Sequence, residues 1–225
     1  MKPLILLRGG GDLASGVALR LHRAGFQIVI TELEKPLAVR RSVSFSEAIY
    51  EGTQTVEGVT GRLVSPDHLQ AALDAGEIPV LIDPNANILR DQLLTIPRST
   101  YVIDARLLKS IPDPLPVDVP LHIGLGPGFT AGENCHAVIE TRRGHTLGRV
   151  YWNGTAQADS GQPDGDPRRV LRAPDSGVIT THATIGDHLK EGQLIAVVKS
   201  SIVVSPFAGI LRGLIHPNIE VTKGM

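Results

Sequence analysis

Hydrophobic residues near the start of the chain follow a strand-like and then a helix-like pattern. An apolar run at 3–7 is followed by Leu13, Val17 and Leu21, whose four-residue spacing places them on one face of a helix. The apolar run at 27–32 is typical of a second buried strand. Together these segments predict a strand–helix–strand unit, which almost always crosses over right-handed.

The same alternation continues as far as residue 153. Ser65, Pro66 and Gly76 have the positions of a helix start and end, and a further helix is expected over 87–94. More apolar runs, each typical of a strand, lie at 78–84, 99–105 and 119–126. We therefore predict that residues 1–153 form an α/β domain of Rossmann-like type, with a mainly parallel sheet and flanking helices.

Two further segments of this region predict additional strands. Residues 53–64 alternate and turn at Gly58, which predicts a small strand or a hairpin, and residues 136–154 read as the two strands of a second, antiparallel hairpin joined around Gly144. We expect the second hairpin to lie at an edge of the sheet. Residues 154–168 are rich in Gly, Asp, Pro, Gln and Ser without periodicity, so they are interpreted as a linker.

The last part of the chain contains an internal repeat. Residues 173–193 match residues 205–225 at a constant offset of 32, with the pairs Pro174 and Pro206, Gly177 and Gly209, Leu189 and Val221, and Gly192 and Gly224. Two such halves predict a small pseudo-symmetric β-sandwich over 169–225. The first half continues with the apolar run 194–198, whose counterpart would begin after Met225. We therefore expect this domain to lack its last strand.

Composition narrows the classes of function. The chain has 225 residues, a formal net charge of −1 and 4% aromatic residues, so neither a basic nucleic-acid surface nor a base-stacking platform is expected. No apolar run reaches the length of a membrane span, and the N-terminal run is too short for a signal peptide. The single cysteine, Cys135, excludes an internal disulfide and favours a reducing, cytoplasmic setting. The oligomeric state stays open.

The glycines after the first strand carry the clearest functional signal. Gly9, Gly11 and Ala14 fit the pattern G-x-G-x-x-[G/A], and Glu32 ends the next predicted strand 23 residues after Gly9. Such a loop lets a phosphate approach the backbone at a helix N-terminus, while the acid accepts from ribose hydroxyls. Asp12 would place negative charge near a pyrophosphate, so it is also a candidate N-cap or a ligand for a metal or an amine. The alternative is a tight turn without a ligand.

Other candidates lie at the ends of the remaining strands. In an open α/β sheet the ligand lies beyond the carboxyl ends of the strands, so we expect one shared rim. Besides Arg8, its predicted cofactor-binding residues are Gly9, Gly10, Gly11, Asp12, Glu32, Asp83, Arg106, Gly124, Gly126 and Gly128. Asp12 and Asp104 are the candidate catalytic acids, although each aspartate alone is also typical of a cap or turn. Arg40 and Arg41 either clamp a phosphate or form a solvated, acid-pairing strip.

The glycine-rich segment 124–132 leads to Cys135. A loop with so many glycines either bends sharply or admits something close to its backbone. A lone cysteine beside it is a candidate nucleophile or sulfur carrier, and the alternative is a small buried hydrophobic residue. The histidines show no metal-ligand spacing, so no metal site is predicted.

The motifs also resemble known families. The C-terminal repeat resembles the biotinyl/lipoyl barrel-sandwich domain, but Lys199 falls off the register of the carrier lysine and is interpreted as an ordinary surface residue. The chain as a whole resembles the YqeB-type family, accessory proteins of the selenium-dependent molybdenum hydroxylase system. The segments that carry this resemblance are "RGGGDLASGVALRLHRAGF", "EKPLAVRRSVSFSEAIYEG" and "GLGPGFTAGENCHAVIETRRGHTLGRV". The first glycine loop is similar to the Rossmann part of xanthine dehydrogenase accessory proteins.

Three functions follow as hypotheses. The resemblance implies a maturation protein that binds a nucleotide or a molybdopterin-type cofactor and assists its delivery, or its sulfur or selenium modification, to a molybdenum hydroxylase client. The glycine motif with Glu32 alternatively indicates an NAD(P)-dependent oxidoreductase, although Tyr50, Tyr101 and Tyr151 have no suitable lysine partners. The third is a non-enzymatic scaffold that docks a hydroxylase through its C-terminal domain.

Overall fold

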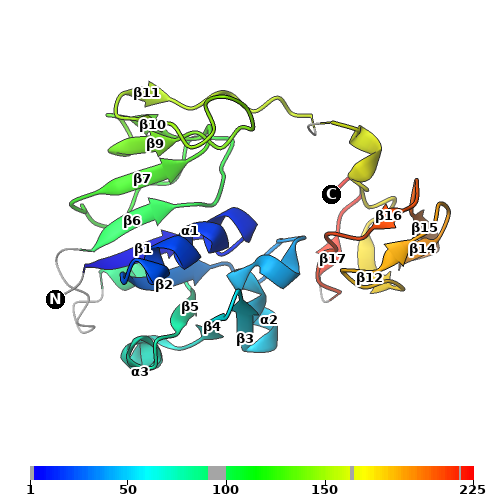
Figure 1. Ribbon diagram of the computed structural model, residues 1–225, viewed down its shortest axis with the longest axis horizontal. Coiled ribbons are helices and arrows are strands. Elements are labelled where there is room, and N and C mark those ends of the chain that lie inside the picture. Colours follow the sequence, from blue (N-terminus) through cyan, green and yellow to red (C-terminus); the bar gives the residue numbers. More distant parts are fainter. Residues whose placement is uncertain (1–2, 91–99, 163–164, 218) are drawn as a thin grey trace. The chain divides into compact units, whose positions relative to one another are not determined.

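The computed structural model describes residues 3–90, 100–162, 165–217 and 219–225 (Figure 1). Contacts within the chain divide it into two compact units. The first comprises Met1–Pro36 and Val43–Asp159, and the second comprises Leu37–Ser42 and Ser160–Met225. The short segment Leu37–Ser42, which lies inside the predicted α/β domain in sequence, therefore packs with the C-terminal unit.

The first unit contains a large, mostly parallel sheet, as the alternation of strands and helices predicts. Within the described residues it has nine strands in the order β10-β9-β7-β6-β1-β2-β5-β4-β3. Their bounds are β1 (Leu4–Arg8), β2 (Gln27–Glu32), β3 (Thr53–Val56), β4 (Val59–Leu63), β5 (Ile78–Ile82), β6 (Tyr101–Asp104), β7 (His122–Leu125), β9 (Ala137–Ile139) and β10 (Val150–Tyr151). The two predicted hairpins are confirmed, because β3 pairs antiparallel with β4 and β10 pairs antiparallel with β9 at the other edge.

The first glycine loop, residues 9–11, directly follows β1 at the centre of the sheet. β1 is buried along its whole length and pairs in parallel with β2 on one side and β6 on the other. From β1 the chain first builds outward through β2 and β5, and it then returns to build β6 and β7 on the opposite side. The strand order thus reverses between β1 and β6. In open α/β sheets, this is where a crevice forms at the carboxyl ends of the strands.

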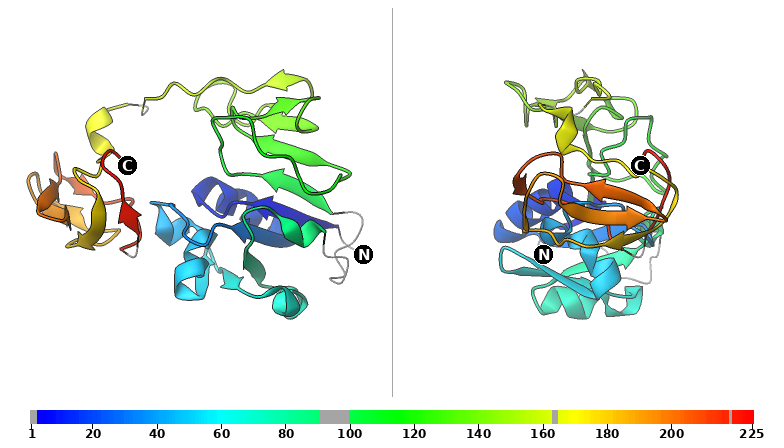
Figure 2. Two further views of the ribbon diagram at one scale, coloured as in Figure 1. Left: turned by 180° about the vertical axis from the view of Figure 1, so that it is seen from behind. Right: turned by 90° about the vertical axis from the view of Figure 1, so that its right-hand side faces the viewer.

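Helices are few and lie on both faces of the sheet (Figures 1 and 2). On one face, α1 (Asp12–Arg23) and α2 (Ala48–Glu51) cover a core that includes Ile5, Leu7 and Ala18. On the other face, α3 (Leu69–Asp74) covers Leu4 and Leu6. Side chains on the two faces of β1 therefore pack into two different hydrophobic cores, as expected because successive side chains of a strand point to opposite faces. Of the helix expected over 87–94, the described part forms one 3-10 turn, Asn87–Leu89, and residues 91–94 lie outside the described residues.

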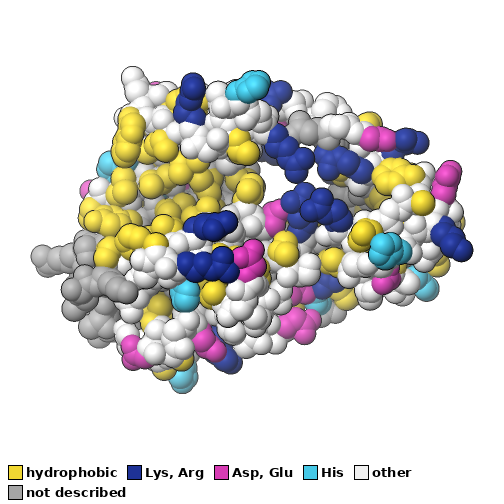
Figure 3. Space-filling model, viewed as in Figure 1, with side chains coloured by type: hydrophobic (Ala, Val, Ile, Leu, Met, Phe, Trp, Pro, Cys, Tyr) yellow, Lys and Arg dark blue, Asp and Glu magenta, His cyan; other side chains and the backbone are white. Residues whose placement is uncertain are grey.

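The half of the sheet beyond β1 is less covered. Figure 3, in the view of Figure 1, shows hydrophobic side chains gathered over β6, β7 and β9, beside α1. Ile123 and Ile139 on this face are only partly buried. In the part of the chain that the structure describes, no helix is long and apolar enough to cross a membrane.

The second unit consists of small antiparallel sheets whose register follows the internal repeat (Figure 2). Its strands are β12 (Gly177–Thr181), β13 (His188–Leu189), β14 (Leu194–Val198), β15 (Ser201–Val204), β16 (Gly209–Ile210) and β17 (Glu220–Val221). The starts of β12 and β16, and those of β13 and β17, are separated by the offset of 32 residues found in the sequence. The pair Gly177–Val221 has its counterpart in Gly209–Leu189, so the repeat extends to the strand pairing.

Lys199 lies in the tight turn between β14 and β15. Its side chain is 59% exposed, and its Nζ lies 3.4 Å from Asp175 Oδ1. This placement agrees with its interpretation as a surface residue.

Candidate functional site

The first glycine loop (residues 9–11) joins β1 to α1 at the reversal point of the sheet. Gly9 has a φ of +89°, which few side chains tolerate, and its N–H donates to Thr31 O at 2.8 Å. Gly10 lies so close to Ser46 that a Cβ would be 2.9 Å from Ser46 N. Gly11 differs, because no atom lies within 4 Å of the position its Cβ would take. The positive φ thus accounts for Gly9 and close packing accounts for Gly10, but neither accounts for Gly11.

Gly11 is also the N-cap of α1. Its φ of −64° and ψ of −177° are extended, no side chain caps the helix there, and its carbonyl accepts the first helical bond from Ser15 N. Asp12 is the first helical residue rather than the N-cap, and a carboxylate in the first turn interacts favourably with the helix dipole. The start of this 12-residue helix therefore has backbone N–H groups beside open space at Gly11.

Glu32 reaches this loop, but its carboxylate is bound by the protein backbone. Oε1 accepts from Gly10 N at 2.6 Å, and Oε2 accepts from Leu33 N at 2.8 Å. Glu32 is buried, and burial raises the pKa of its carboxyl above the usual value although both backbone bonds lower it. One carboxylate oxygen thus stabilises the loop and the other binds the backbone directly after β2, and binding of ribose hydroxyls by Glu32 stays a prediction.

Two arginines and two aspartates form an ion cluster at the ends of β1 and β6. Arg8 is 1% exposed and donates to Asp104 Oδ2 at 3.2 Å and to Asp113 Oδ2 at 2.8 Å. Arg106 donates to Asp104 at 2.7 Å and to Asp113 Oδ1 at 2.9 Å. The buried carboxylate of Asp104 contacts both arginines, and the buried guanidinium of Arg8 contacts both aspartates, so each buried charge has two partners of opposite sign. The cluster is therefore a strong structural element at the reversal point.

The half-exposed member of the cluster is Asp113. Partial burial raises the pKa of its carboxyl, but the bonds from Arg8 and Arg106 outweigh this effect and lower the pKa to about 2. Sequence reasoning missed Asp113, because it lies in an irregular connection 105 residues from Arg8 and has no periodicity. The one available signal was the charge of Arg8 at the end of a buried strand, which requires a carboxylate but does not say which one.

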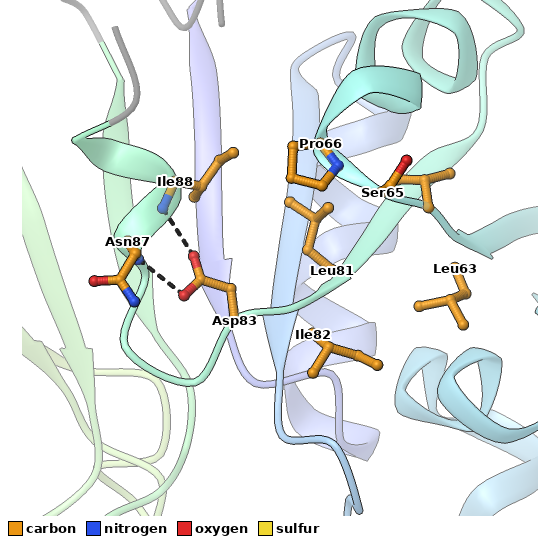
Figure 4. Close-up of a pocket in the computed structure, with 9 residues that line it drawn as sticks. Leu63, Ser65, Pro66, Leu81, Ile82, Asp83, Asn87 and Ile88 are labelled. Carbon is orange, nitrogen blue, oxygen red and sulfur yellow. Dashed lines mark hydrogen bonds between the residues drawn. The ribbon is translucent and has the colours of Figure 1, made fainter. Parts of the chain in front are cut away.

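Asp83 stabilises a turn beside a pocket of the first unit. Its two oxygens accept from Asn87 N at 2.9 Å and Ile88 N at 2.8 Å, as Figure 4 shows. The pocket has a volume of about 500 Å³ and lies where β4 and β5 end. Its walls are mainly apolar and are formed by Leu63, Val64, Ser65, Pro66, Leu81, Ile82, Asp83, Asn87 and Ile88. The sequence pointed to Asp83 but not to this apolar pocket.

The second glycine loop (residues 124–132) is filled by its own chain at Gly124, Gly126 and Gly128, whereas Gly132 has no atom within 4 Å of its Cβ position. A Cβ at Gly124 would overlap the ring of Phe129, and one at Gly128 would lie 2.5 Å from Ser110 O and 2.6 Å from Leu108 O. Gly126 has a φ of +94°, and its Cβ would lie 3.2 Å from Thr141 Oγ1. The predicted close approach to this backbone exists, and Phe129 and residues 108–110 make it.

Cys135 lies behind this loop in a small hydrophobic cluster with Phe129 and Val138. It is 8% exposed, and its thiol donates to Ala137 O with an Sγ–O distance of 3.3 Å. Burial raises the pKa of the Cys135 thiol despite backbone bonds that lower it, so the reactive thiolate is disfavoured. These observations favour the buried-hydrophobe alternative over the nucleophile.

Arg40 and Arg41 belong to Leu37–Ser42, which packs with the second unit. Arg41 Nε donates to Leu214 O at 2.7 Å. A phosphate clamp formed by Arg40 and Arg41 stays a prediction.

Comparison with known proteins identifies a relative. The chain is 43% identical over 98% of its length to the protein named "Uncharacterized protein YqeB" from Escherichia coli (strain K12), and it spans 41% of the length of that relative. This similarity agrees with the resemblance to the YqeB-type family that the sequence motifs carry. No family model matches the chain. No solved structure matches it either.

Proposed function

We propose that this chain, as a member of the YqeB family, binds a nucleotide or a molybdopterin-type cofactor at the start of α1. We further propose that it assists in the delivery of this cofactor, or in its sulfur or selenium modification, to a molybdenum hydroxylase client. The observation that carries the proposal is Gly11, a glycine at a helix N-terminus, directly after the central strand, that faces open space. A phosphate at this point would accept from backbone N–H groups and would lie in the positive potential of the helix.

The topology supports the binding step. In chain order, the five central parallel strands are arranged third, second, first, fourth and fifth, as in the Rossmann-like folds that bind dinucleotides. We therefore assign the first unit to this fold, and the second unit to the barrel-sandwich type on the strength of its repeat. Cys135 is left out of the proposed chemistry because it is buried and its pKa is raised.

The proposal differs from a nicotinamide-dependent dehydrogenase in the role of Glu32. In such an enzyme the acid after the second strand binds the ribose, whereas here Gly10 N and Leu33 N bind its two oxygens. Binding of NAD would require Glu32 to accept the ribose hydroxyls in addition to these two backbone bonds.

Native mass spectrometry of gently purified protein tests whether a nucleotide or pterin copurifies. Calorimetric titration with pyrophosphate, ADP, NAD and NADP then measures binding to the wild type and to Gly11→Ala. Gly16→Ala is the matched control, since it lies in the same helix and also has no atom within 4 Å. We expect Gly11→Ala to weaken binding at least tenfold and Gly16→Ala to leave it unchanged. Absence of any copurifying ligand and of binding at millimolar concentration would refute the proposal.

A further inference from the structure

The two halves of the second unit share more than strand pairs. Two backbone hydrogen bonds that close the first half recur 32 residues away in the second. The bond from Gly192 N to Ser205 O is equivalent to the bond from Gly224 N to Ala173 O. The bond from Ser205 N to Gln193 O is equivalent to the bond from Ala173 N to Met225 O. All four N–O distances are between 2.8 and 2.9 Å. The two halves therefore share a pseudo-twofold symmetry, and the strand pairing seen in one half predicts the pairing expected in the other.

Among the described residues, the strand β14 has no counterpart in the second half. In the first half, β12 pairs antiparallel with β14, and His182 N donates to Ile195 O at 2.8 Å. In the second half, the residue equivalent to His182 is Leu214, whose N–H donates to Val39 O at 2.8 Å. Among the described residues, no strand pairs with 211–213 in the way that β14 pairs with β12. A carbonyl from Leu37–Ser42 thus takes the place of one carbonyl of a strand.

Burial shows that this replacement is incomplete. In the first half, β14 covers its neighbours with Ile195, Ala196 and Val198, each at most 2% exposed. Ile179 on β12 is accordingly buried, whereas its equivalent Leu211 is only partly buried. Val39 supplies one acceptor, but it does not supply the apolar strand that would bury Leu211.

We propose that residues 211–214 form a pairing edge for one further antiparallel strand, an apolar five-residue segment that continues the second repeat. The symmetry fixes its register, since Met225 is equivalent to Gln193 and Gln193 directly precedes Leu194–Val198. It also fixes the chemistry, with apolar side chains at the positions equivalent to Ile195, Ala196 and Val198. When this strand is bound, Leu214 N donates to the strand instead of to Val39 O. Main-chain bonds would provide the affinity and the apolar side chains the specificity.

The test appends Leu-Ile-Ala-Val-Val, the sequence of Leu194–Val198, after Met225 of the full chain. The matched control appends Leu-Pro-Ala-Pro-Val, which has the same length but lacks two of the N–H donors that a strand needs. We expect the apolar extension to slow amide exchange at 211–214 at least tenfold and to raise the unfolding midpoint of the second unit relative to the control.

Three outcomes would overturn the proposal. The first is equal exchange at 211–214 in the two extended chains. The second is protection by the apolar extension at the outer edge of β15 instead. The third is slow amide exchange at 211–214 already in the unextended chain, together with a dimer in sedimentation, because two copies would then pair with each other at this edge.

Discussion

The two glycine loops of the first unit satisfy the same sequence expectation and differ in what fills them. In the loop at 9–11, Gly11 faces open space at the start of a helix. In the loop at 124–132, Phe129 packs against Gly124, and the carbonyls of Leu108 and Ser110 pack against Gly128. Glycine at a strand end therefore indicates a close neighbour to the backbone, but only the structure tells whether that neighbour is the chain itself.

The difference assigns the loops different roles. The second loop is part of the core, and changes in it should affect stability. The first loop contains the position where a change should affect binding with little effect on stability. The predictions below test this division, in order of decreasing effect on the free energy of unfolding.

The largest effect is expected at His122, on β7 next to the second loop. Its ring packs edge-on against Phe129 with 6.0 Å between centroids, and burial lowers its pKa to about 4. Because the folded state keeps His122 neutral while the unfolded chain protonates it near pH 6.5, stability should fall as the pH falls from about 6.5 to about 4. The loss should reach about 3 kcal/mol. Urea unfolding against pH measures it, and an unchanged slope in His122→Leu would count against this assignment.

Gly128→Ala should destabilise the protein by about 2–3 kcal/mol, since its Cβ would meet two backbone carbonyls that cannot rotate away. Gly11→Ala is the matched change in the other loop and should destabilise the protein by only about 0.5–1 kcal/mol, the effect of a poorer N-cap residue. Thermal and urea unfolding of both variants give the comparison. Equal destabilisation of the two variants would remove the proposed difference between the loops.

Cys135→Ala should cost about 1 kcal/mol, because it removes a buried atom from the cluster with Phe129. The native thiol should also react slowly with a thiol reagent at pH 8 and become fast only on unfolding, since its pKa is raised and its exposure is small. Rapid labelling of the folded protein would instead support the sulfur-carrier hypothesis.

The smallest effect is a gain. Gly16 lies inside α1 with no atom within 4 Å of its Cβ position, so Gly16→Ala should stabilise the protein by about 0.5–1 kcal/mol through helix propensity. Thermal unfolding would show this as a small rise in midpoint. A loss of stability would mean that Gly16 serves close packing, as Gly128 does.

Much of the fold was predictable because its signals are local. The buried runs, the helix after Gly11, the two edge hairpins and the 32-residue repeat all follow from periodicity or self-similarity in the sequence. The sequence also places Arg8, Glu32 and Asp104 at strand ends, where the structure has them.

The pairing of those side chains was not predictable, because it depends on tertiary geometry. Asp113 meets Arg8 across 105 positions, and Gly10 N binds Glu32 across 22. Leu37–Ser42 leaves the unit that its neighbours in sequence form, and no composition change marks this. From the sequence alone, Gly124 resembles a glycine that contacts a ligand, because no periodic pattern predicts that the ring of Phe129 packs against it.

The short outer strands of the large sheet have a consequence for behaviour at high protein concentration. β3 has four residues and β10 has two, and each is held by its own hairpin partner. A wide sheet with long, apolar outer strands would offer a template on which other chains could aggregate. Because these outer strands are short, each offers only a few backbone groups for pairing with another chain.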